Sequence, residues 1–480
     1  MKAFRSISRT FAVLAAMAGT WGGSALADPA PRQPNIVYII ADDQGWKDVG
    51  YHGSDIKTPN IDALARGGVR LENFIAQPLC TQTRAALMTG RYPYRTGMQT
   101  AVIPSAGTYG LDTDEWLLPQ ALKDAGYQTK MVGKWHLGHA DQKYWPRQRG
   151  FDYHYGPVLG EIDYYTHSAH GVLDWFRDNK PVEEKGYATD LLGADAVRLI
   201  QEHDTDTPLF MYLAFTAPHS PFQAPQEYID RNAGIEDPTR RTYAGMITAL
   251  DDQVGQVVQA LKDRGMYEDT IIVYQSDNGG VRSSKFAGES DVSKLVLPAD
   301  NSPYRDGKGT LYEGGTRVIA LANWPGHIKP GTVVEEPMHV VDMYPTLVGL
   351  AGGNTGKAKP LDGMDMWPTI AQGAKSPRET TIYSIEPQQA ALRKGDWKLV
   401  WRSALPSSTE LFNLAKDPYE QHDLSKANPD KVAELQAIAQ EQAQVAAHSK
   451  FMENAFGALW PVLFGAVKLP AEGQELEAVP

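Results

Sequence analysis

The hydrophobic pattern between residue 35 and about residue 350 alternates short apolar runs with amphipathic stretches. Four apolar runs predict buried strands, at residues 35–40, 129–133, 209–215 and 270–274. Between them, apolar side chains recur on one helical face and predict helices at residues 114–125, 188–202 and 241–264. Strands that alternate with helices favour an α/β fold, here a large, mostly parallel sheet flanked by helices.

The pattern changes after about residue 375. Three further runs predict strands at residues 380–385, 391–393 and 397–401, and a helix is predicted at residues 430–445. Lys394-Gly395-Asp396 predicts a hairpin turn between the last two strands. We therefore expect a main α/β domain over residues 28–375 and a C-terminal subdomain over residues 376–480. The subdomain holds a small antiparallel sheet, a helix and a tail.

The N-terminus has the pattern of an export signal. Lys2, Arg5 and Arg9 precede a short apolar run at residues 11–17, and Ala25-Leu26-Ala27 is a typical cleavage site. Residues 1–27 therefore predict a signal peptide, cleaved near Ala27, and a periplasmic or secreted mature protein. This run, and a second apolar segment at residues 458–469, are too short to span a bilayer, so no membrane span is expected.

Composition narrows the classes of partner. Hydrophobic residues make up 42% of the chain and charged residues 22%, which is typical of a globular protein with a sizeable core. The net charge is −12, which is unfavourable for binding nucleic acid through its phosphates. An anionic substrate would therefore need a local basic pocket.

Each of the four main strands is followed by residues suited to chemistry. These are Asp42 and Asp43, then Lys134 and His136, then His219, and finally Asp277 and Asn278. The carboxyl ends of parallel strands meet at one edge of a sheet, where α/β proteins build their sites. Carboxylate and amide oxygens at Asp42, Asp43, Asp277 and Asn278 favour Ca²⁺ or Mg²⁺ over Zn²⁺. The alternative is that the acidic pairs cap separate helices and never meet.

Cys80 is the only cysteine, so the chain cannot form an internal disulfide. It is either a small buried apolar residue or a reactive or modified one. The residues after it predict a helix that ends near Gly90, which places Cys80 at the helix N-terminus. Backbone N–H groups there favour an anion and would lower the pKa of the thiol. Arg84 lies one turn into the helix and could face the same site.

These motifs together resemble type I sulfatases. The sequence Cys80-Thr81-Gln82-Thr83-Arg84 is similar to the Cys-x-Pro-x-Arg or Cys-x-Ala-x-Arg signature of that family. Further likenesses follow in order along the chain, in residues 41–45, 132–138, 217–219, 276–280, 305–308 and 313–315. Within the family the chain most resembles the arylsulfatase B, or N-acetylgalactosamine-4-sulfatase, branch, through residues 77–80, 92–99 and 163–165.

The resemblance implies an alkaline-phosphatase-like fold and a sulfatase activity. A maturation enzyme would convert Cys80 to formylglycine, whose hydrated aldehyde is the nucleophile. Ca²⁺, or Mg²⁺ as the alternative, would bind Asp42, Asp43, Asp277, Asn278 and the modified Cys80. Positive charge would come from Arg84, Lys134 and Lys308. Proton transfers would fall to Asp277, to His219 or Lys308 at the leaving group, and to His136.

The substrate is predicted only by class. The branch likeness implies a 4-O-sulfated galactosamine or galactose unit of a carbohydrate. Polar and aromatic residues beside the site, Glu161, Tyr164 and His170, could contact the sugar, although such a cluster also suits a packing loop.

Two alternatives stay open. One is a phosphodiesterase or phosphonate hydrolase of the same superfamily, because tetrahedral anions resemble each other. The other is an unactivated protein that binds sulfated glycans, because Gln82 stands where the signature has Pro or Ala.

Overall fold

The computed structural model describes residues 33–283 and 297–464. The predicted signal peptide and the last 16 residues lie outside the described residues. From Gln33 onward the chain forms one compact unit, so the boundary expected at residues 375/376 stays a prediction.

A ten-stranded sheet forms the centre of the fold, in the order β13-β2-β12-β11-β1-β10-β4-β5-β8-β9. Its five middle strands, from β11 to β5, run parallel. Their bounds are β11 (Thr270–Ser276), β1 (Asn35–Ala41), β10 (Leu209–Ala214), β4 (Gln128–Gly133) and β5 (Tyr153–Gly156). The four apolar runs of the sequence are thus four adjacent strands. The expected fold class, a large and mostly parallel sheet flanked by helices, is confirmed.

Short strands that the apolar pattern did not predict complete the sheet. They are β13 (Thr332–Val334), β2 (Val69–Leu71), β12 (Ala320–Asn323), β8 (Phe176–Arg177) and β9 (Lys180–Pro181). Two small two-stranded sheets pair β14 (Met338–His339) with β3 (Phe74–Ile75), and β6 (Ser168–Ala169) with β7 (Val172–Leu173). Strands of two to four residues are too short to show a period of their own.

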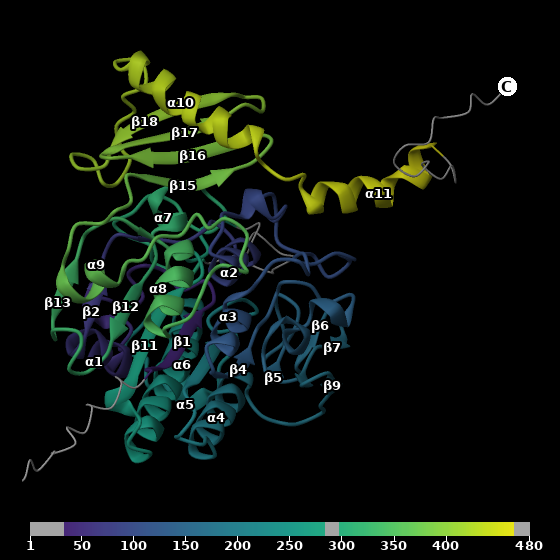
Figure 1. The fold of residues 1–480 in the computed structure, drawn as a ribbon, viewed down its shortest axis with the longest axis vertical. Coiled ribbons are helices and arrows are strands. Elements are labelled where there is room, and N and C mark those ends of the chain that lie inside the picture. Colours follow the sequence, from purple (N-terminus) through teal and green to yellow (C-terminus); the bar gives the residue numbers. More distant parts are fainter. Residues whose placement is uncertain (1–32, 284–296, 465–480) are drawn as a thin grey trace, which may run out of the picture. The chain divides into compact units, whose positions relative to one another are not determined.

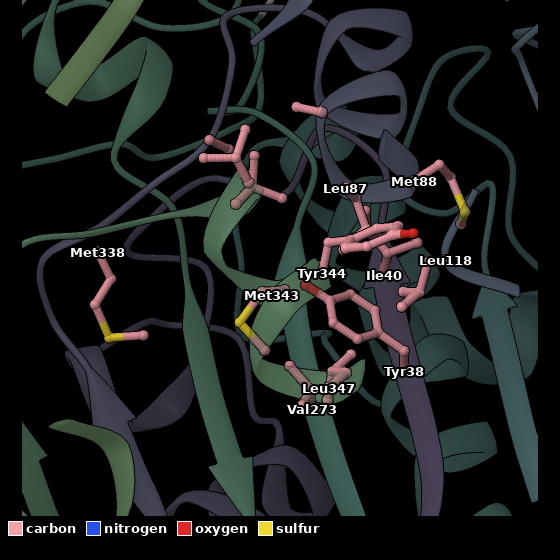
Figure 2. Close-up of a cluster of buried hydrophobic side chains, with 14 of the residues drawn as sticks. Tyr38, Ile40, Leu87, Met88, Leu118, Val273, Met338, Met343, Tyr344 and Leu347 are labelled. Carbon is pink, nitrogen blue, oxygen red and sulfur yellow. The ribbon is translucent and has the colours of Figure 1, made fainter. Parts of the chain in front are cut away.

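Helices cover both faces of the central sheet, because the side chains of its strands alternate between two cores. On β1, Tyr38 and Ile40 belong to one core and Val37 and Ile39 to the other. Figure 2 shows the first core, where side chains of β1 and β11 meet α2 (Cys80–Thr89), α3 (Leu118–Asp124) and α8 (Met343–Leu350). The second core lies under α1 (Pro59–Gly67), α4 (Ala188–Gln201) and α6 (Pro238–Asp263). Shorter helices are α5 (Gln226–Asp230), α7 (Glu313–Thr316) and α9 (Trp367–Gln372).

Two helices begin away from their predicted first residues, for local reasons. The helix expected from residue 114 begins at Leu118, because Leu117 is extended and Pro119 is tolerated only in a first turn. The helix expected from residue 241 begins at Pro238, where the Asp237 carboxylate caps it by accepting the Arg240 N–H at 2.7 Å.

The C-terminal part forms a separate four-stranded antiparallel sheet, as Figure 1 shows. Its strands are β15 (Thr380–Ile385), β16 (Gln389–Lys394), β17 (Trp397–Arg402) and β18 (Ser408–Asn413). Helix α10 (Pro429–Gln444) lies against this sheet, and α11 (Lys450–Phe464) follows it. Sequence analysis predicted this sheet and α10 but missed β18 and α11. Among the described residues, no helix is long and apolar enough to cross a membrane.

Candidate active site

The carboxyl ends of four adjacent strands bring the sequence motifs together. Asp277 and Asn278 follow β11, Asp42 and Asp43 follow β1, His219 follows β10, and Lys134 and His136 follow β4. All seven side chains are buried. The parallel register of the strands sets this arrangement, since each strand ends at the same edge. The acidic pairs therefore meet and do not cap separate helices.

Cys80 begins helix α2 and points into this group. Leu79 before it is extended, and Gly90 ends the helix in a left-handed conformation. The Cys80 Sγ atom lies 3.4 Å from Asp42 Oδ1 and 4.0 Å from Asp43 Oδ1. Thr83, one turn into the helix, donates its hydroxyl to the Asp277 carbonyl oxygen at 2.5 Å. That bond fixes the start of α2 against the end of β11.

Arg84 is completely buried in the same group. Its Nη2 atom lies 2.9 Å from Asp277 Oδ2, and its Nη1 donates to the Lys134 carbonyl oxygen at 2.9 Å. The guanidinium thus joins α2 to the ends of β11 and β4. A charge held by two such partners keeps one orientation.

Two lysines neutralise the remaining carboxylates. Lys134 Nζ lies 2.5 Å from Asp42 Oδ2, and Lys308 Nζ lies 2.7 Å from Asp43 Oδ2. With Arg84 on Asp277, three carboxylates face three cations. A divalent cation added to this balanced group would make the site positive, which favours an anionic ester.

The donor set fits such a cation. Oxygen, sulfur and nitrogen atoms of Asp42, Asp43, Cys80 and His219 all lie within 4.8 Å of one another. The Asn278 Nδ2 donates to Asp43 Oδ1 at 2.8 Å, while its Oδ1 is buried without a hydrogen-bond partner. A buried carbonyl oxygen of this kind is costly unless something binds it. The group therefore suits a divalent cation, and it includes His219, which sequence analysis did not place among the ligands.

Burial controls the ionisation of the central groups. Burial raises the pKa of the Cys80 thiol well above its usual value, and the negative charge of Asp277 adds to this. The lowered thiol pKa expected at a helix N-terminus is therefore wrong for this site, because desolvation outweighs the helix dipole. Burial also raises the pKa of Asp277 to about 6. Burial opposes ionisation of Asp43 as well, but Lys308 and His219 beside it lower its pKa to about 2.

Both motif histidines are held neutral. Burial, with Lys308 next to it, lowers the pKa of His219 to about 4. Its Nδ1 donates to the Ser220 carbonyl oxygen at 2.6 Å, which leaves Nε2 as an acceptor 3.1 Å from Lys308 Nζ. Burial, then Lys134 and Arg84, lower the pKa of His136 well below its usual value. Its Nε2 lies 3.1 Å from the Ile103 carbonyl oxygen, and its Nδ1 has no hydrogen-bond partner.

The predicted substrate contacts divide into two kinds. Glu161 and His170 face solvent in contact with each other, with 3.3 Å between Oε1 and Nε2, and side chains 42% and 59% exposed. They lie beside the site, because Gly160 rests against the His136 ring. Tyr164 is only 1% exposed and has no surface for a ligand. The structure thus corrects the expected substrate contact at Tyr164, whose hydroxyl is bonded to backbone carbonyls near His219.

Two supporting residues escaped sequence analysis. Asn301 accepts the Gly280 N–H at 2.8 Å and donates to the Asp306 carbonyl oxygen at 2.9 Å, which ties the Asn278 loop to the Lys308 loop. Thr81 donates to the His136 carbonyl oxygen at 3.1 Å. Thr81 lies inside the Cys80 motif, which is a usable signal. An isolated Asn in a loop offers none.

Comparisons with known proteins agree with this geometry. The sulfatase family model matches residues 34–353. Arylsulfatase J of Mus musculus is 38% identical over 458 residues, which cover 84% of this chain and 74% of that protein. N-acetylgalactosamine-6-sulfatase of Mus musculus is 34% identical over 450 residues, covering 83% and 84%. The crystal structure of Ps i-CgsB in complex with k-i-k-neocarrahexaose has a TM-score of 0.79 at 34% identity, covering 90% of this chain and 97% of that one. The chain therefore belongs to the sulfatase family and is a sulfuric ester hydrolase.

Proposed function

We propose that this protein removes sulfate from a sulfated carbohydrate, with formylglycine made from Cys80 as the nucleophile and Ca²⁺ as the metal. The observation that carries the proposal is the position of Cys80 Sγ, 3.4 Å from Asp42 within a buried group of three carboxylates and three cations. The named relatives support the carbohydrate class. One is named for N-acetylgalactosamine 6-sulfate, and a similar structure holds an oligosaccharide.

The environment of Cys80 argues for its modification. Burial and Asp277 keep the thiol protonated, and a protonated thiol is a weak nucleophile. Conversion to the hydrated aldehyde supplies a hydroxyl for attack on sulfur and a second hydroxyl for release of sulfate. We propose that a formylglycine-generating enzyme carries out this conversion.

The metal would be held by Asp42, Asp43, Asp277, Asn278 and the modified residue 80. It supplies positive charge that polarises the sulfate oxygens. Oxygen donors favour Ca²⁺, and Mg²⁺ is the second choice. Lys134, Lys308 and Arg84 offset the negative charge of the carboxylates, so that the sulfate meets a positive pocket.

Proton transfer would fall to Asp277, to the pair His219 and Lys308, and to His136. Asp277 accepts the proton of the attacking hydroxyl, and its pKa of about 6 suits that exchange. His219 Nε2 is unprotonated and lies 3.1 Å from Lys308 Nζ, so Lys308 supplies the proton of the leaving alcohol, either directly or through His219. His136 accepts the second proton at Nδ1, because its Nε2 is bonded to the Ile103 carbonyl.

The position of the sulfate on the sugar is the finest part of the proposal. The motif likeness supports 4-O-sulfated galactosamine or galactose, whereas one relative is named for 6-sulfate. Glu161 and His170 are exposed beside the site and suit hydrogen bonds to sugar hydroxyls.

The basic and apolar N-terminal segment supports export to the periplasm or outside the cell.

Mass spectrometry of the tryptic peptide Leu71–Arg84 tests this proposal. The protein is made with and without a formylglycine-generating enzyme, denatured and treated with a thiol alkylator. We expect a fraction that carries the aldehyde, and we expect turnover to rise with that fraction on 4-, 6- and 2-sulfated sugars tested side by side. The Cys80→Ala variant is the inactive control.

A fully alkylated thiol with every maturation enzyme tried would overturn the proposal. Gln82 would explain why Cys80 is not converted, because it stands where the signature has Pro or Ala. Binding of sulfated glycans without turnover would then be the better description. Faster turnover of a phosphodiester or phosphonate than of any sulfate ester would instead favour the phosphodiesterase alternative.

A further inference from the structure

A second buried ionic cluster lies where the C-terminal sheet contacts α7. Lys398 of β17 is completely buried, with Nζ 2.8 Å from Glu313 Oε1 and 2.8 Å from Glu420 Oε1. On the other side of Glu313, Arg317 Nη2 lies 2.6 Å from Oε2, and the Tyr383 hydroxyl donates to Oε1 at 2.8 Å. Two carboxylates thus face two cations, and all four side chains are buried.

The charges of this cluster compensate one another only when all four charged residues are present. Burying charges is costly, and removing one partner leaves the others uncompensated. Burial opposes ionisation of Glu313, but Lys398 and Arg317 outweigh it and hold the pKa of Glu313 far below its usual value. Glu420 also accepts the backbone N–H of Glu313 at 2.6 Å, so its carboxylate fixes the start of α7 directly.

Helix α7 is in turn fixed between two loops of the active site. The Gly314 N–H donates to the Arg305 carbonyl oxygen at 2.9 Å, on the loop that carries Lys308. The Gly315 carbonyl oxygen accepts the Gly279 N–H at 3.0 Å, directly after Asn278. A Cβ on Gly279 would lie 1.9 Å from the Gly314 carbonyl oxygen, and one on Gly314 would lie 2.4 Å from that of Arg305. Only glycine allows these approaches, so the backbone of α7 is in direct contact with both loops.

We propose that Lys398 is a positioning residue for the active site, which acts through Glu313 and α7 on the loops of Asn278 and Lys308. The C-terminal sheet thereby helps to position the site, although Lys398 contacts none of the residues proposed to hold the metal. The activity arm of the test below rests on the proposed sulfatase reaction, whereas the metal arm rests only on the proposed Ca²⁺ site.

Few contacts separate Lys398 from the two active-site loops. Without Lys398, Glu313 keeps Arg317 as its partner, but Glu420 loses the cation beside its carboxylate, and its repulsion with Glu313 displaces the start of α7. The displacement reaches Asn278 through Gly279, and Lys308 through the Arg305 loop. Supporting residues of this kind typically change metal affinity or activity by about 10- to 100-fold.

The test compares Lys398→Met with the double variant Lys398→Met/Glu420→Gln, which restores the balance of charges. Arg378→Met is the matched control. Arg378, just before β15, is also a buried cation, but it pairs with Asp342 and not with a residue of α7. The readouts are kcat and KM for 4-nitrophenyl sulfate, and the Ca²⁺ concentration that gives half of the maximal rise in melting temperature.

We expect Lys398→Met to lower kcat and raise the half-saturating Ca²⁺ concentration by about tenfold or more. Relative to Lys398→Met, the double variant should have a kcat about fivefold or more higher and a half-saturating Ca²⁺ concentration about fivefold or more lower. Arg378→Met should lower the melting temperature while its kcat and Ca²⁺ response stay within about twofold of the wild type. A merely structural role of Lys398 would give the same result as Arg378→Met, and that result would overturn the proposal.

Tyr383→Phe keeps the test decisive if Lys398→Met does not fold. It removes one hydrogen bond to Glu313 and leaves every charge in place. We expect a two- to fivefold change in the same readouts, corresponding to about 1 kcal/mol or less, and an unchanged kcat and Ca²⁺ response would overturn the proposal. If the wild type hydrolyses no sulfate ester but the variants still weaken the Ca²⁺ response, the proposed function fails and the positioning role stands.

Discussion

The buried hydroxyl of Tyr164 lies 2.9 Å from the backbone carbonyl oxygen of His219 and donates a hydrogen bond to it. The same hydroxyl lies 2.7 Å from the Thr216 carbonyl oxygen. It therefore holds the loop after β10, whose His219 side chain reaches Lys308 and Asp43. Tyr164 acts on the site through the backbone.

Tyr164→Phe should lower kcat roughly tenfold, because the released loop misplaces His219. The loss of one buried hydrogen bond should lower stability by about 1–3 kcal/mol. Tyr187→Phe is the control, since Tyr187 stacks on Tyr164 but bonds the Gln223 carbonyl oxygen. Steady-state kinetics of both variants measure kcat, and urea unfolding measures their free energies of unfolding. Equal kcat values in the two variants would contradict the positioning role.

Metal binding should depend on the unpartnered oxygen of Asn278. Asn278→Ala removes that donor, so a higher Ca²⁺ concentration should be needed for activity and for thermal stabilisation. Chelation should abolish activity in the wild type, and added Ca²⁺ should restore it. At a concentration 100 times Kd, binding to the folded state alone contributes about 2.7 kcal/mol.

A matched variant separates this effect from a general loss of packing. Asn232→Ala removes a buried amide that bonds Tyr228 and Thr248, away from the site. Its Ca²⁺ response should equal that of the wild type. If both Asn variants shift the Ca²⁺ midpoint alike, Asn278 is not a metal ligand.

Glu161 and His170 should affect large substrates only. Glu161→Gln and His170→Ala should raise KM for a sulfated oligosaccharide by roughly fivefold, about 1 kcal/mol, which is typical of an exposed polar contact. Neither change should alter kinetics on 4-nitrophenyl sulfate, which is too small to reach the rim. Glu202→Gln, at the residue directly after α4, serves as control because Glu202 is another exposed acid, paired with Arg198. An unchanged KM on every carbohydrate would exclude these residues from substrate contact.

His154 should make the protein less stable in acid. It is completely buried on β5, and burial lowers the pKa of its imidazole to about 4. The unfolded chain binds the proton near pH 6.5, so stability is complete above that value and is lost as the pH falls toward 4. Between pH 7.5 and pH 5 the loss from this group is about 2 kcal/mol.

His154→Leu should remove that part of the pH dependence. Urea unfolding at both pH values measures it, and the difference between wild type and variant cancels the other titrating groups. Parallel pH dependences in the two proteins would show that His154 is not responsible.

Much of the fold was predictable from local patterns. The apolar runs that became β1, β4, β10 and β11 are long enough to show their burial without tertiary information. The acidic, amide, lysine and histidine motifs each follow directly after one of these strands. That position was enough to place them at one edge of the sheet, because the carboxyl ends of parallel strands meet there. The Cys80 motif and its helix were visible for the same reason, since the helix has a local start and a glycine at its end.

Other features depend on neighbours that are distant in the sequence. The strands β2, β12 and β13 contain three or four residues each, and only pairing within the sheet makes them strands. The pKa of Cys80 reversed its expected direction, because desolvation depends on what surrounds the thiol and not on its helix. Tyr164 changed from a surface contact to a buried support for the same kind of reason.

The sequence by itself determined which polar motifs follow the main strands and therefore meet at one edge of the sheet, because those signals are local in the chain. The tertiary structure alone decided that three cations balance three carboxylates, that His219 lies within 4.8 Å of the atoms of Asp42, Asp43 and Cys80 that could bind a metal, and that Lys398 reaches Glu313 from the C-terminal sheet. Charge and burial act over a few ångströms in space. Residues 85 positions apart can meet at that distance only after the chain has folded.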